Sequence, residues 1–379
     1  MTSDTRRVVL VAPDKFKGSL TAREVAMALA SGVSDAHPEL RVVTCPVADG
    51  GEGTVEAAIA SGFRSRTATV RGPLGHPVEA VFATKGATAV VELAQASGLQ
   101  LLPHPGPSPE TAAAATTYGT GELVVAALDA GATRIVLGLG GSATTDGGAG
   151  MLQALGATFR NEEGKVLGAG LAHPSTIASA DLAGLDPRIA EAEIVVATDV
   201  DNPLCGPRGA AAVFGPQKGA TADLAHALDQ DLRRWSRVLA EAGVTTSPEH
   251  AGAGAAGGVG FAALGALRAL ARPGVDVVLD LVGFENLLAG ACLVVTGEGS
   301  LDEQSLSGKA PIGVLRAAQA RGVPTVAVAG RCLLEPGVLA RVGFQAVHTL
   351  QDREPDLTTC ILEAPRLLRE VGRELTVPE

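Results

Sequence analysis

A short apolar run that ends in a glycine-rich polar loop, followed by a helical pattern, recurs along this 379-residue chain and constrains its fold more than any other feature. In VVLVAPDKFKGSLTAREV, residues 8–25, a β-branched run predicts a strand, and Thr21 with Glu24 predicts the capping box of a helix. A second run, LRVVTCPVADGG at 40–51, precedes a helix predicted at 54–61. Strands that alternate with helices in this way are typical of a doubly wound parallel sheet.

The middle of the chain follows a different pattern. Residues 64–93 alternate polar and apolar positions in short runs split by Gly and Pro, which predicts antiparallel strands. The apolar runs TRIVLGLGG (133–141), EIVVATDVDNPL (193–204) and DVVLDLVG (276–283) predict further buried strands.

From ACLVVTGEG at 291–299 onward, the alternation of strand and helix resumes. The two ends of the chain therefore share one pattern that the middle lacks. The expected fold is α/β: a Rossmann-like parallel-sheet domain formed by residues 1–72 and 292–379, interrupted by a second, inserted α/β domain with some antiparallel strands at residues 73–291.

Charge and composition exclude several classes of partner. The net charge is −11 and no segment concentrates Lys or Arg, so nucleic acid is not an expected partner. No segment has the pattern of a signal peptide or a transmembrane helix. The five cysteines are scattered without C-x-x-C spacing, as in a reducing compartment. We therefore expect a cytoplasmic protein without a membrane partner.

Three polar loops follow predicted strands near the two ends of the chain. PDKFKGSLT (13–21) carries two lysines before a helix, which suits an anion, although such lysines also occur in solvated turns. ADGGEGT (48–54) carries two acids that could bind hydroxyls or metal, or cap a helix. TGEGSLDEQSLSGKAP (296–311) departs from the P-loop spelling at Glu303 and Ala310. Its polar side chains, too many to explain as packing, are Glu298, Asp302, Gln304, Ser305 and Lys309.

Two further loops lie in the middle of the chain. GLGGSATTDGGAG (138–150) predicts a backbone phosphate cradle and also contains G-x-G-x-x-A, although no acidic residue ends a following strand as the dinucleotide fingerprint requires. In ATDVDNPLCGPRGAAAVFGPQKGA (197–220), Asp199 and Asp201 are spaced to share one Mg²⁺ or to form a turn, and Lys218 could reach a phosphate. Open α/β sheets bind ligands beyond the carboxyl ends of their strands, so these loops predict a small anionic ligand, with phosphate and Mg²⁺.

Six segments of the chain together resemble the bacterial type of the glycerate kinase family, in order and over nearly the whole length. They are APDKFKGSLTA, PVADGGEGT, GLGGSATTDGGAGMLQALG, TDVDNPLCGPRGAAAVFGPQKGA, GAGAAGGVG and TGEGSLDEQSLSGKAP. The resemblance implies ATP-dependent phosphorylation of D-glycerate by a protein with two α/β domains around a cleft. It also implies 2-phosphoglycerate as the product in preference to 3-phosphoglycerate, with Mg²⁺ as cofactor and ATP as co-substrate.

The chemistry of phosphoryl transfer then suggests roles for individual residues. Residues expected to bind the substrate are Asp14, Lys15, Lys17, Ser19, Asp49 and Glu52. Residues expected to bind the nucleotide are Gly140, Gly141, Ser142, Asp146 and Lys218. Catalytic roles are expected for Asp199, Asp302, Lys17 and Lys309, with Asp199 and Asp302 as metal ligands.

Two other functions remain open on sequence alone. The G-x-G-x-x-A match suits a nicotinamide-dependent hydroxy-acid oxidoreductase, and a non-catalytic sugar-acid-binding protein would also use two domains. A homodimer is one assembly that the sequence leaves open.

Overall fold

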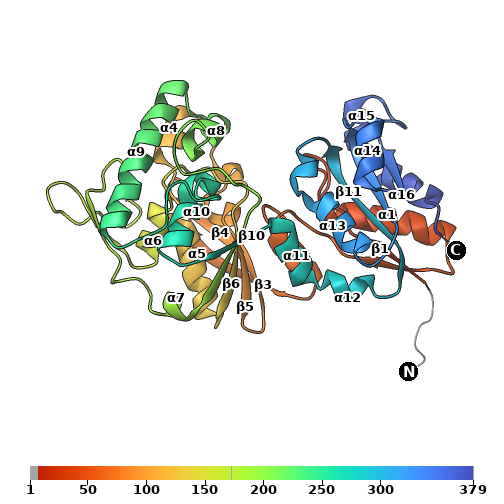
Figure 1. Cartoon of the computed structure of the whole chain (residues 1–379), viewed down its shortest axis with the longest axis horizontal. Helices are drawn as coiled ribbons and strands as arrows, with labels where there is room; N and C mark the ends of the chain where they lie inside the picture. Colours follow the sequence, from red (N-terminus) through yellow and green to blue (C-terminus); the bar gives the residue numbers. More distant parts are fainter. Residues whose placement is uncertain (1–6, 172, 379) are drawn as a thin grey trace. The chain divides into compact units, whose positions relative to one another are not determined.

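The computed structural model describes residues 7–171 and 173–378, which form two compact units (Figure 1). Unit 1 contains residues 7–62 and 273–378, and unit 2 contains residues 63–272. The chain therefore leaves unit 1 once, builds unit 2 without interruption, and returns. The α/β class expected from the sequence is confirmed.

Unit 1 is built on a five-stranded sheet with the order β13-β12-β11-β1-β2, in which every pair is parallel. β1 lies between β2 and β11, so the first and last parts of the sequence share one sheet (Figure 1). The strands of unit 1 are β1 (Val8–Val11), β2 (Arg41–Thr44), β11 (Ala291–Leu301), β12 (Thr325–Cys332) and β13 (Ala346–Thr349).

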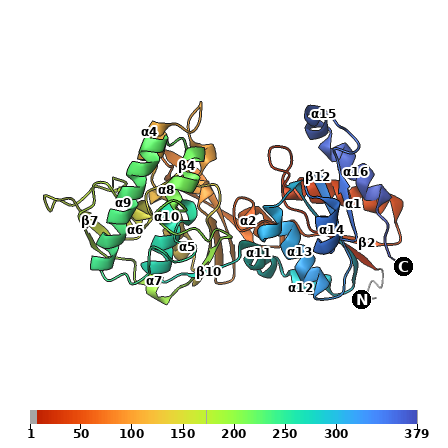
Figure 2. The ribbon, with the colours of Figure 1, turned by 45° about the horizontal axis from the view of Figure 1, so that its top comes forward.

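Helices cover both faces of this sheet, because alternate residues of each strand point to opposite faces. Val9 and Val11 pack in one cluster with α1 and α16, which lie side by side (Figure 2). Leu10 and Ala12 pack in a second cluster with α2, α11 and α13. The helices of unit 1 are α1 (Ala22–Ala36), α2 (Thr54–Ala60), α11 (Gly274–Val282), α12 (Phe284–Leu288), η3 (Ser305–Ser307), α13 (Ala310–Gln319), α14 (Pro336–Val342), α15 (Leu357–Leu362) and α16 (Ala364–Glu374).

The capping box predicted for the first helix is confirmed. The Glu24 backbone N–H donates to Thr21 Oγ1 at 3.2 Å, and the Thr21 N–H donates to Glu24 Oε2 at 2.8 Å. These bonds satisfy donors that the first turn of α1 would otherwise leave unpaired.

Unit 2 contains a six-stranded mixed sheet, β10-β9-β6-β5-β4-β3, and a small β7-β8 sheet. The β3-β4 and β4-β5 pairs are antiparallel, as predicted for residues 64–93, and the other pairs of the larger sheet are parallel. The strands are β3 (Arg64–Arg71), β4 (Pro77–Lys85), β5 (Thr88–Glu92), β6 (Arg134–Gly138), β7 (Thr158–Arg160), β8 (Ser179–Asp181), β9 (Glu193–Ala197) and β10 (Leu270–Arg272). The helices are α3 (Ala94–Ser97), η1 (Leu99–Leu101), α4 (Pro109–Ala114), α5 (Tyr118–Asp129), α6 (Ala149–Ala154), α7 (Arg188–Glu191), α8 (Ala210–Phe214), η2 (Pro216–Lys218), α9 (Ala222–Glu241) and α10 (Ala255–Gly265).

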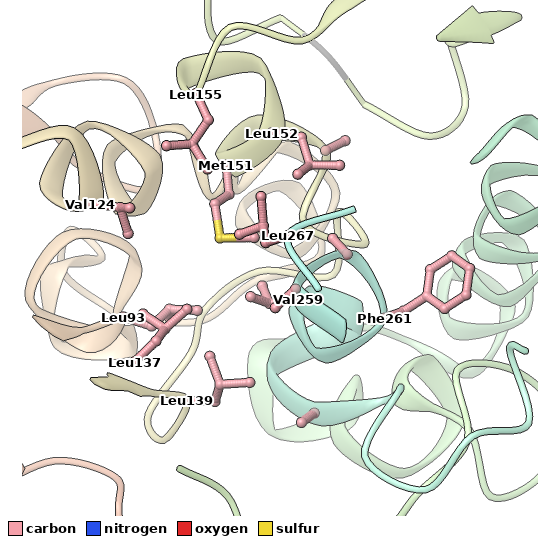
Figure 3. Close-up of a cluster of buried hydrophobic side chains, with 14 of the residues drawn as sticks. Leu93, Val124, Leu137, Leu139, Met151, Leu152, Leu155, Val259, Phe261 and Leu267 are labelled. Atoms are coloured by element: carbon pink, nitrogen blue, oxygen red, sulfur yellow. The ribbon is translucent and has the colours of Figure 1, made fainter. Parts of the chain in front are cut away.

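Aliphatic side chains from several helices fill the core of unit 2 (Figure 3). Met151 of α6 lies close to Val259 of α10 and to Leu267, while Phe261 points to the other side of α10 (Figure 3). Trp235 of α9 is fully buried in the same cluster. This core fixes α6 and α10, the helices that follow two glycine-rich loops.

One predicted strand is wrong. DVVLDLVG, residues 276–283, lies mostly in helix α11, which buries Val275, Val278, Leu279 and Val282. Their spacing is i, i+3, i+4, i+7, so one helical stripe faces the core of unit 1. The β-branched composition favoured a strand, but the period of the buried positions is that of a helix.

The boundaries between the units also differ from those expected at residues 72 and 292. β3 belongs to unit 2 because it pairs along its whole length, Arg64 to Arg71, with β4. α11 and α12 belong to unit 1 because they pack against its sheet. Among the described residues, no helix is long and apolar enough to cross a membrane.

Candidate active site

Three of the predicted polar loops meet at one edge of the unit 1 sheet. β2, β1 and β11 are neighbours and run parallel, so the loops after β1 and β2 leave the sheet beside the end of β11. Residues 296–301, predicted as the start of a loop, instead continue β11 to Leu301, because they pair with β12. From β1 the chain continues to β2 on one side, whereas β11 is followed by β12 on the other. Such a reversal of strand order is the position where open α/β sheets bind ligands.

The loop after β1 is fastened to β11 by backbone and side-chain bonds. The Asp14 N–H donates to the Gly297 carbonyl at 2.8 Å, and Thr296 Oγ1 donates to the Ala12 carbonyl at 2.8 Å. Gly299 allows this close approach, because a Cβ there would lie only 3.2 Å from the Lys17 nitrogen. The Asp14 carboxyl is thereby held beside the end of β11.

Carboxyl groups of the loops after β1 and β2 and of β11 lie near one another at this edge of the sheet. Burial raises the pKa of Asp14 to about 8, and the charges of Asp49 and Glu298 add to the rise. Burial also raises the pKa of Glu298, while Ser305 and the Lys309 ammonium oppose that rise. Glu298 is 7% exposed, and its buried Oε1 has no hydrogen-bond partner among the described residues. A buried acceptor of this kind is expected to receive a bond from a ligand or water.

Lysines surround these carboxyls. Lys15 Nζ donates to the Glu52 carbonyl at 2.7 Å and lies 3.3 Å from Glu52 Oε2, which joins the first loop to the second. Lys309 Nζ lies 3.9 Å from Glu298 Oε2 and 4.0 Å from Asp302 Oδ1. Lys17 is exposed. Acceptors and cations at one edge suit a ligand that carries both hydroxyls and a negative charge.

Asp302 and Ser19 have structural partners of their own. The Gln304 and Ser305 N–H groups donate to Asp302 Oδ1 at 2.9 and 3.2 Å, which orients the carboxylate in the turn before α13. Ser19 Oγ donates to the Ile361 carbonyl at 3.2 Å, which ties the first loop to α15.

In unit 2, the glycine-rich loop 138–150 is organised by Asp146, a carboxylate with no exposed surface. Asp146 Oδ2 accepts from the Thr117 N–H at 2.7 Å and from Thr117 Oγ1 at 2.8 Å. The N–H groups of Gly148 and Gly150 also donate to this carboxylate, at 3.1 and 3.2 Å. The structure therefore places Asp146 inside the loop, where it satisfies amides that were expected to face a phosphate.

Lys218 lies under the same loop and is 2% exposed. Its Nζ donates to Ser142 Oγ at 2.9 Å and to the Thr144 carbonyl at 2.5 Å. Burial lowers the pKa of Lys218 to about 7, and the charge of Asp146 opposes this. The hydroxyls of Thr144 and Thr145 are buried without a partner among the described residues. A cation and unpaired hydroxyls beneath a glycine-rich turn suit a phosphate.

The predicted metal ligands do not lie in one loop. Asp199 and Asp201 are exposed in the segment that follows β9. Asp199 lies in unit 2 and Asp302 in unit 1. Across residues 7–171 and 173–378, no group of three or more His, Cys, Asp or Glu side chains could by itself hold a metal ion.

Sequence reasoning missed two features of the site. The bonds of Asp146 within the loop and to the start of α5 are not evident from the sequence; they hold the loop together, and a role of Asp146 in nucleotide binding stays a prediction. Glu298 was noticed among the polar residues of its loop but was given no role. The available signal was an acidic residue that directly follows an apolar run, in the buried part of β11.

These features define an α/β protein whose parallel sheet presents acids and lysines for a small polar ligand at the point where its strand order reverses. Comparison with known proteins identifies the family. The chain matches the model of the Glycerate kinase family over residues 9–377 and belongs to that family.

Named relatives agree with this assignment. Glycerate kinase of Bacillus subtilis (strain 168) is 44% identical over 370 residues, which are 97% of this chain and 96% of the relative. Glycerate 2-kinase of Escherichia coli (strain K12) is 43% identical over 345 residues, which are 90% of each chain. A crystal structure of a candidate glycerate kinase 2 from Salmonella typhimurium LT2 has a TM-score of 0.83 at 40% identity, covering 97% of this chain and 96% of that chain.

The packing of the 138–150 loop against α10 can be tested at Gly257, which has a φ of +69°. A Cβ there would lie 1.9 Å from the Thr144 carbonyl oxygen, the acceptor of the Lys218 ammonium. We expect Gly257→Ala to lower the free energy of unfolding, measured with denaturant, by more than Gly131→Ala does. Gly131 has a φ of +88° and no heavy atom within 4 Å of its Cβ position. The control therefore carries only the left-handed backbone cost, about 1–2 kcal/mol. Equal losses would show that the loop does not pack as described.

Proposed function

We propose that this protein is an ATP-dependent glycerate kinase that phosphorylates the 2-hydroxyl of D-glycerate. The observation that carries the proposal is the set of buried carboxyls and neighbouring lysines beyond β1, β2 and β11, in a chain of the glycerate kinase family. The choice of the 2-hydroxyl rests on the Escherichia coli relative that is named glycerate 2-kinase.

D-glycerate needs a cation for its carboxylate and acceptors for its two hydroxyls. Lys15 and Lys17 on the loop after β1 supply positive charge, while Asp14, Asp49 and Glu52 supply acceptors. We infer that unit 1 binds the substrate. Ser19 supports this site indirectly, because its hydroxyl fastens the loop to α15.

The nucleotide phosphates would bind in unit 2, on the turn formed by Gly140, Gly141 and Ser142 above the Lys218 ammonium. Gly140 and Gly141 are partly exposed, whereas Ser142 accepts the bond from Lys218. A bound phosphate would favour the charged form of this lysine and compensate its burial.

Mg²⁺ fits the donor set of the chain, since this ion takes one or two protein carboxylates together with phosphate oxygens and water. Asp302 is suited to the role because two backbone N–H groups fix the orientation of its carboxylate. Asp199 is the corresponding carboxylate proposed from unit 2. When bound, Mg²⁺ neutralises charge on the β- and γ-phosphate oxygens.

The direct test is an assay of ADP release with ATP, Mg²⁺ and D-glycerate, followed by NMR of the product. We expect one ADP per phosphoglycerate formed and a phosphorus signal coupled to the proton on C2. Absence of ADP release over a panel of small hydroxy acids, with folded protein, would favour a non-catalytic sugar-acid-binding role. NAD(H)-dependent turnover would instead favour the oxidoreductase.

The proposed metal ligands can be tested against exposed carboxylates. We expect Asp199→Asn and Asp302→Asn each to lower kcat by about 10²-fold or more, because loss of a Mg²⁺ ligand weakens charge neutralisation in the transition state. The Mg²⁺ concentration for half-maximal activity should rise in both variants. Asp223→Asn in unit 2 and Glu303→Gln in unit 1 remove exposed carboxylates, serve as the controls and should stay near wild type. Unchanged Mg²⁺ dependence in a test variant would remove that residue from the metal site.

The nucleotide site can be tested by removing the buried ammonium. We expect Lys218→Met to raise the KM for ATP by about 10-fold or more, since a hydrogen bond from a charged group contributes about 1.5–3 kcal/mol. The KM for glycerate should change by less than about 3-fold from the wild-type value. Lys165→Met removes an exposed lysine of the same unit and serves as the control. A larger effect on glycerate than on ATP would move the substrate to unit 2.

A further inference from the structure

We propose that Asp14 is the general base of the reaction, an inference that rests on the proposed function. The Asp14 carboxylate would accept the proton of the substrate hydroxyl while the hydroxyl oxygen attacks the γ-phosphorus of ATP. An oxygen–phosphorus bond to glycerate forms, the bond from the γ-phosphorus to the bridging oxygen breaks, and its electron pair leaves with ADP. Protein kinases place an aspartate in the same role.

The position of Asp14 is fixed by hydrogen bonds to its backbone and to its carboxylate. Its backbone is held by Gly297 of β11, and its Oδ1 accepts from the Lys15 N–H at 2.6 Å. The side chain is 7% exposed, so bulk water is largely kept from it. A base must lie within hydrogen-bond reach of the proton it removes, and a rigid, shielded carboxyl meets that condition once substrate is bound.

The other acids have different partners. Asp49 Oδ1 accepts from the Gly51 N–H at 3.2 Å and so shapes the turn after β2. Asp302 Oδ1 is occupied by two backbone N–H groups. Glu298 lies 3.9 Å from Lys309, and its unpartnered Oε1 can accept a bond from a second ligand hydroxyl. Glyceric acid has two hydroxyls, so one could give its proton to Asp14 while the other donates to Glu298.

The charged groups around Asp14 make it a stronger base than an exposed aspartate. Burial raises the pKa of Asp14 most, and the carboxylates of Asp49 and Glu298 raise it further, whereas Lys15 lowers it. The pKa of Asp14 is raised to about 8, so activity should increase with pH as this carboxyl loses its proton. Removal of the Asp49 charge would lower that pKa and move the increase to lower pH.

The experiment measures kcat and kcat/KM between pH 5.5 and 9.5 for the wild type, Asp14→Asn, Asp14→Glu and Asp49→Asn. We expect Asp14→Asn to lose about 10²–10⁴-fold in kcat, the usual contribution of a general base, and to lose the rise with pH. The KM for ATP should stay within about 3-fold of the wild-type value. Asp14→Glu should recover part of the activity together with a pH-dependent rise, and Asp49→Asn should shift the wild-type rise to lower pH. Asp352→Asn, an exposed carboxylate of the same unit, is the control.

Each result decides between base and structural roles. A normal kcat or an unchanged pH profile in Asp14→Asn would overturn the proposal, and so would a rise in Asp49→Asn that stays in place or moves to higher pH. If Asp14→Asn does not fold, the profiles of Asp14→Glu and Asp49→Asn decide. Carbon-13 NMR titration of the Asp14 carboxyl in the ligand-free protein gives a readout independent of turnover, and an ordinary aspartate pKa there would overturn the proposal. Wild-type protein without glycerate-dependent ADP release would reject the proposed function itself, whereas active wild type with active Asp14→Asn rejects only the base.

Discussion

The parallel register of β2, β1 and β11 is the constraint on which the unit 1 site depends. Val11 and Thr44 are the last residues of β1 and β2 and lie level with Val295, beyond which β11 continues to Leu301 beside the loop after β1. The order of the strands therefore brings the acids on and after them close together, whatever hydrogen bonds their side chains form. Their mutual repulsion is a cost that the apolar packing of the sheet offsets, because helices bury both of its faces.

In unit 2, buried polar side chains hold the glycine-rich loop 138–150 in one conformation. Asp146 binds the amides of Gly148 and Gly150, and Trp235 Nε1 donates to the Gly147 carbonyl at 2.9 Å. In dinucleotide-binding folds, amides at the start of the helix face a pyrophosphate. Here a protein carboxylate accepts from the amides of Gly148 and Gly150 at the start of α6.

Local sequence signals predicted much of the architecture, because they depend on neighbours in the chain. The parallel strands near both ends, the antiparallel strands of the middle and the cap at Thr21 all follow from short-range patterns of apolar, glycine and polar residues. α11 was missed because its β-branched residues favour strands, although their spacing is helical.

The environment of the site residues could not be predicted in the same way. Burial raises the pKa of Asp14 most, and the charges of Asp49 and Glu298, which are distant in sequence and meet only through strand order, add to the rise. The burial of Lys218 likewise depends on Ser142 and Thr144, more than seventy residues earlier. The sequence therefore indicated which loops carry polar groups, but the sheet topology determines which of these groups interact.

The single excursion of the chain through residues 63–272 has a consequence for the order in which the protein folds. During synthesis β1 and β2 emerge first, but β1 has no partner on its second side until β11 follows some 280 residues later. Unit 2 is continuous in sequence, so it can fold as soon as its own residues have been synthesised. The apolar residues of the amino-terminal segment of unit 1 remain exposed during that time. Unit 1 is then completed when β1 pairs with β11. Strands so distant in sequence pair slowly, because the contact order is high. The β1 edge that faces β11 therefore stays unpaired until the final quarter of the polypeptide has been synthesised.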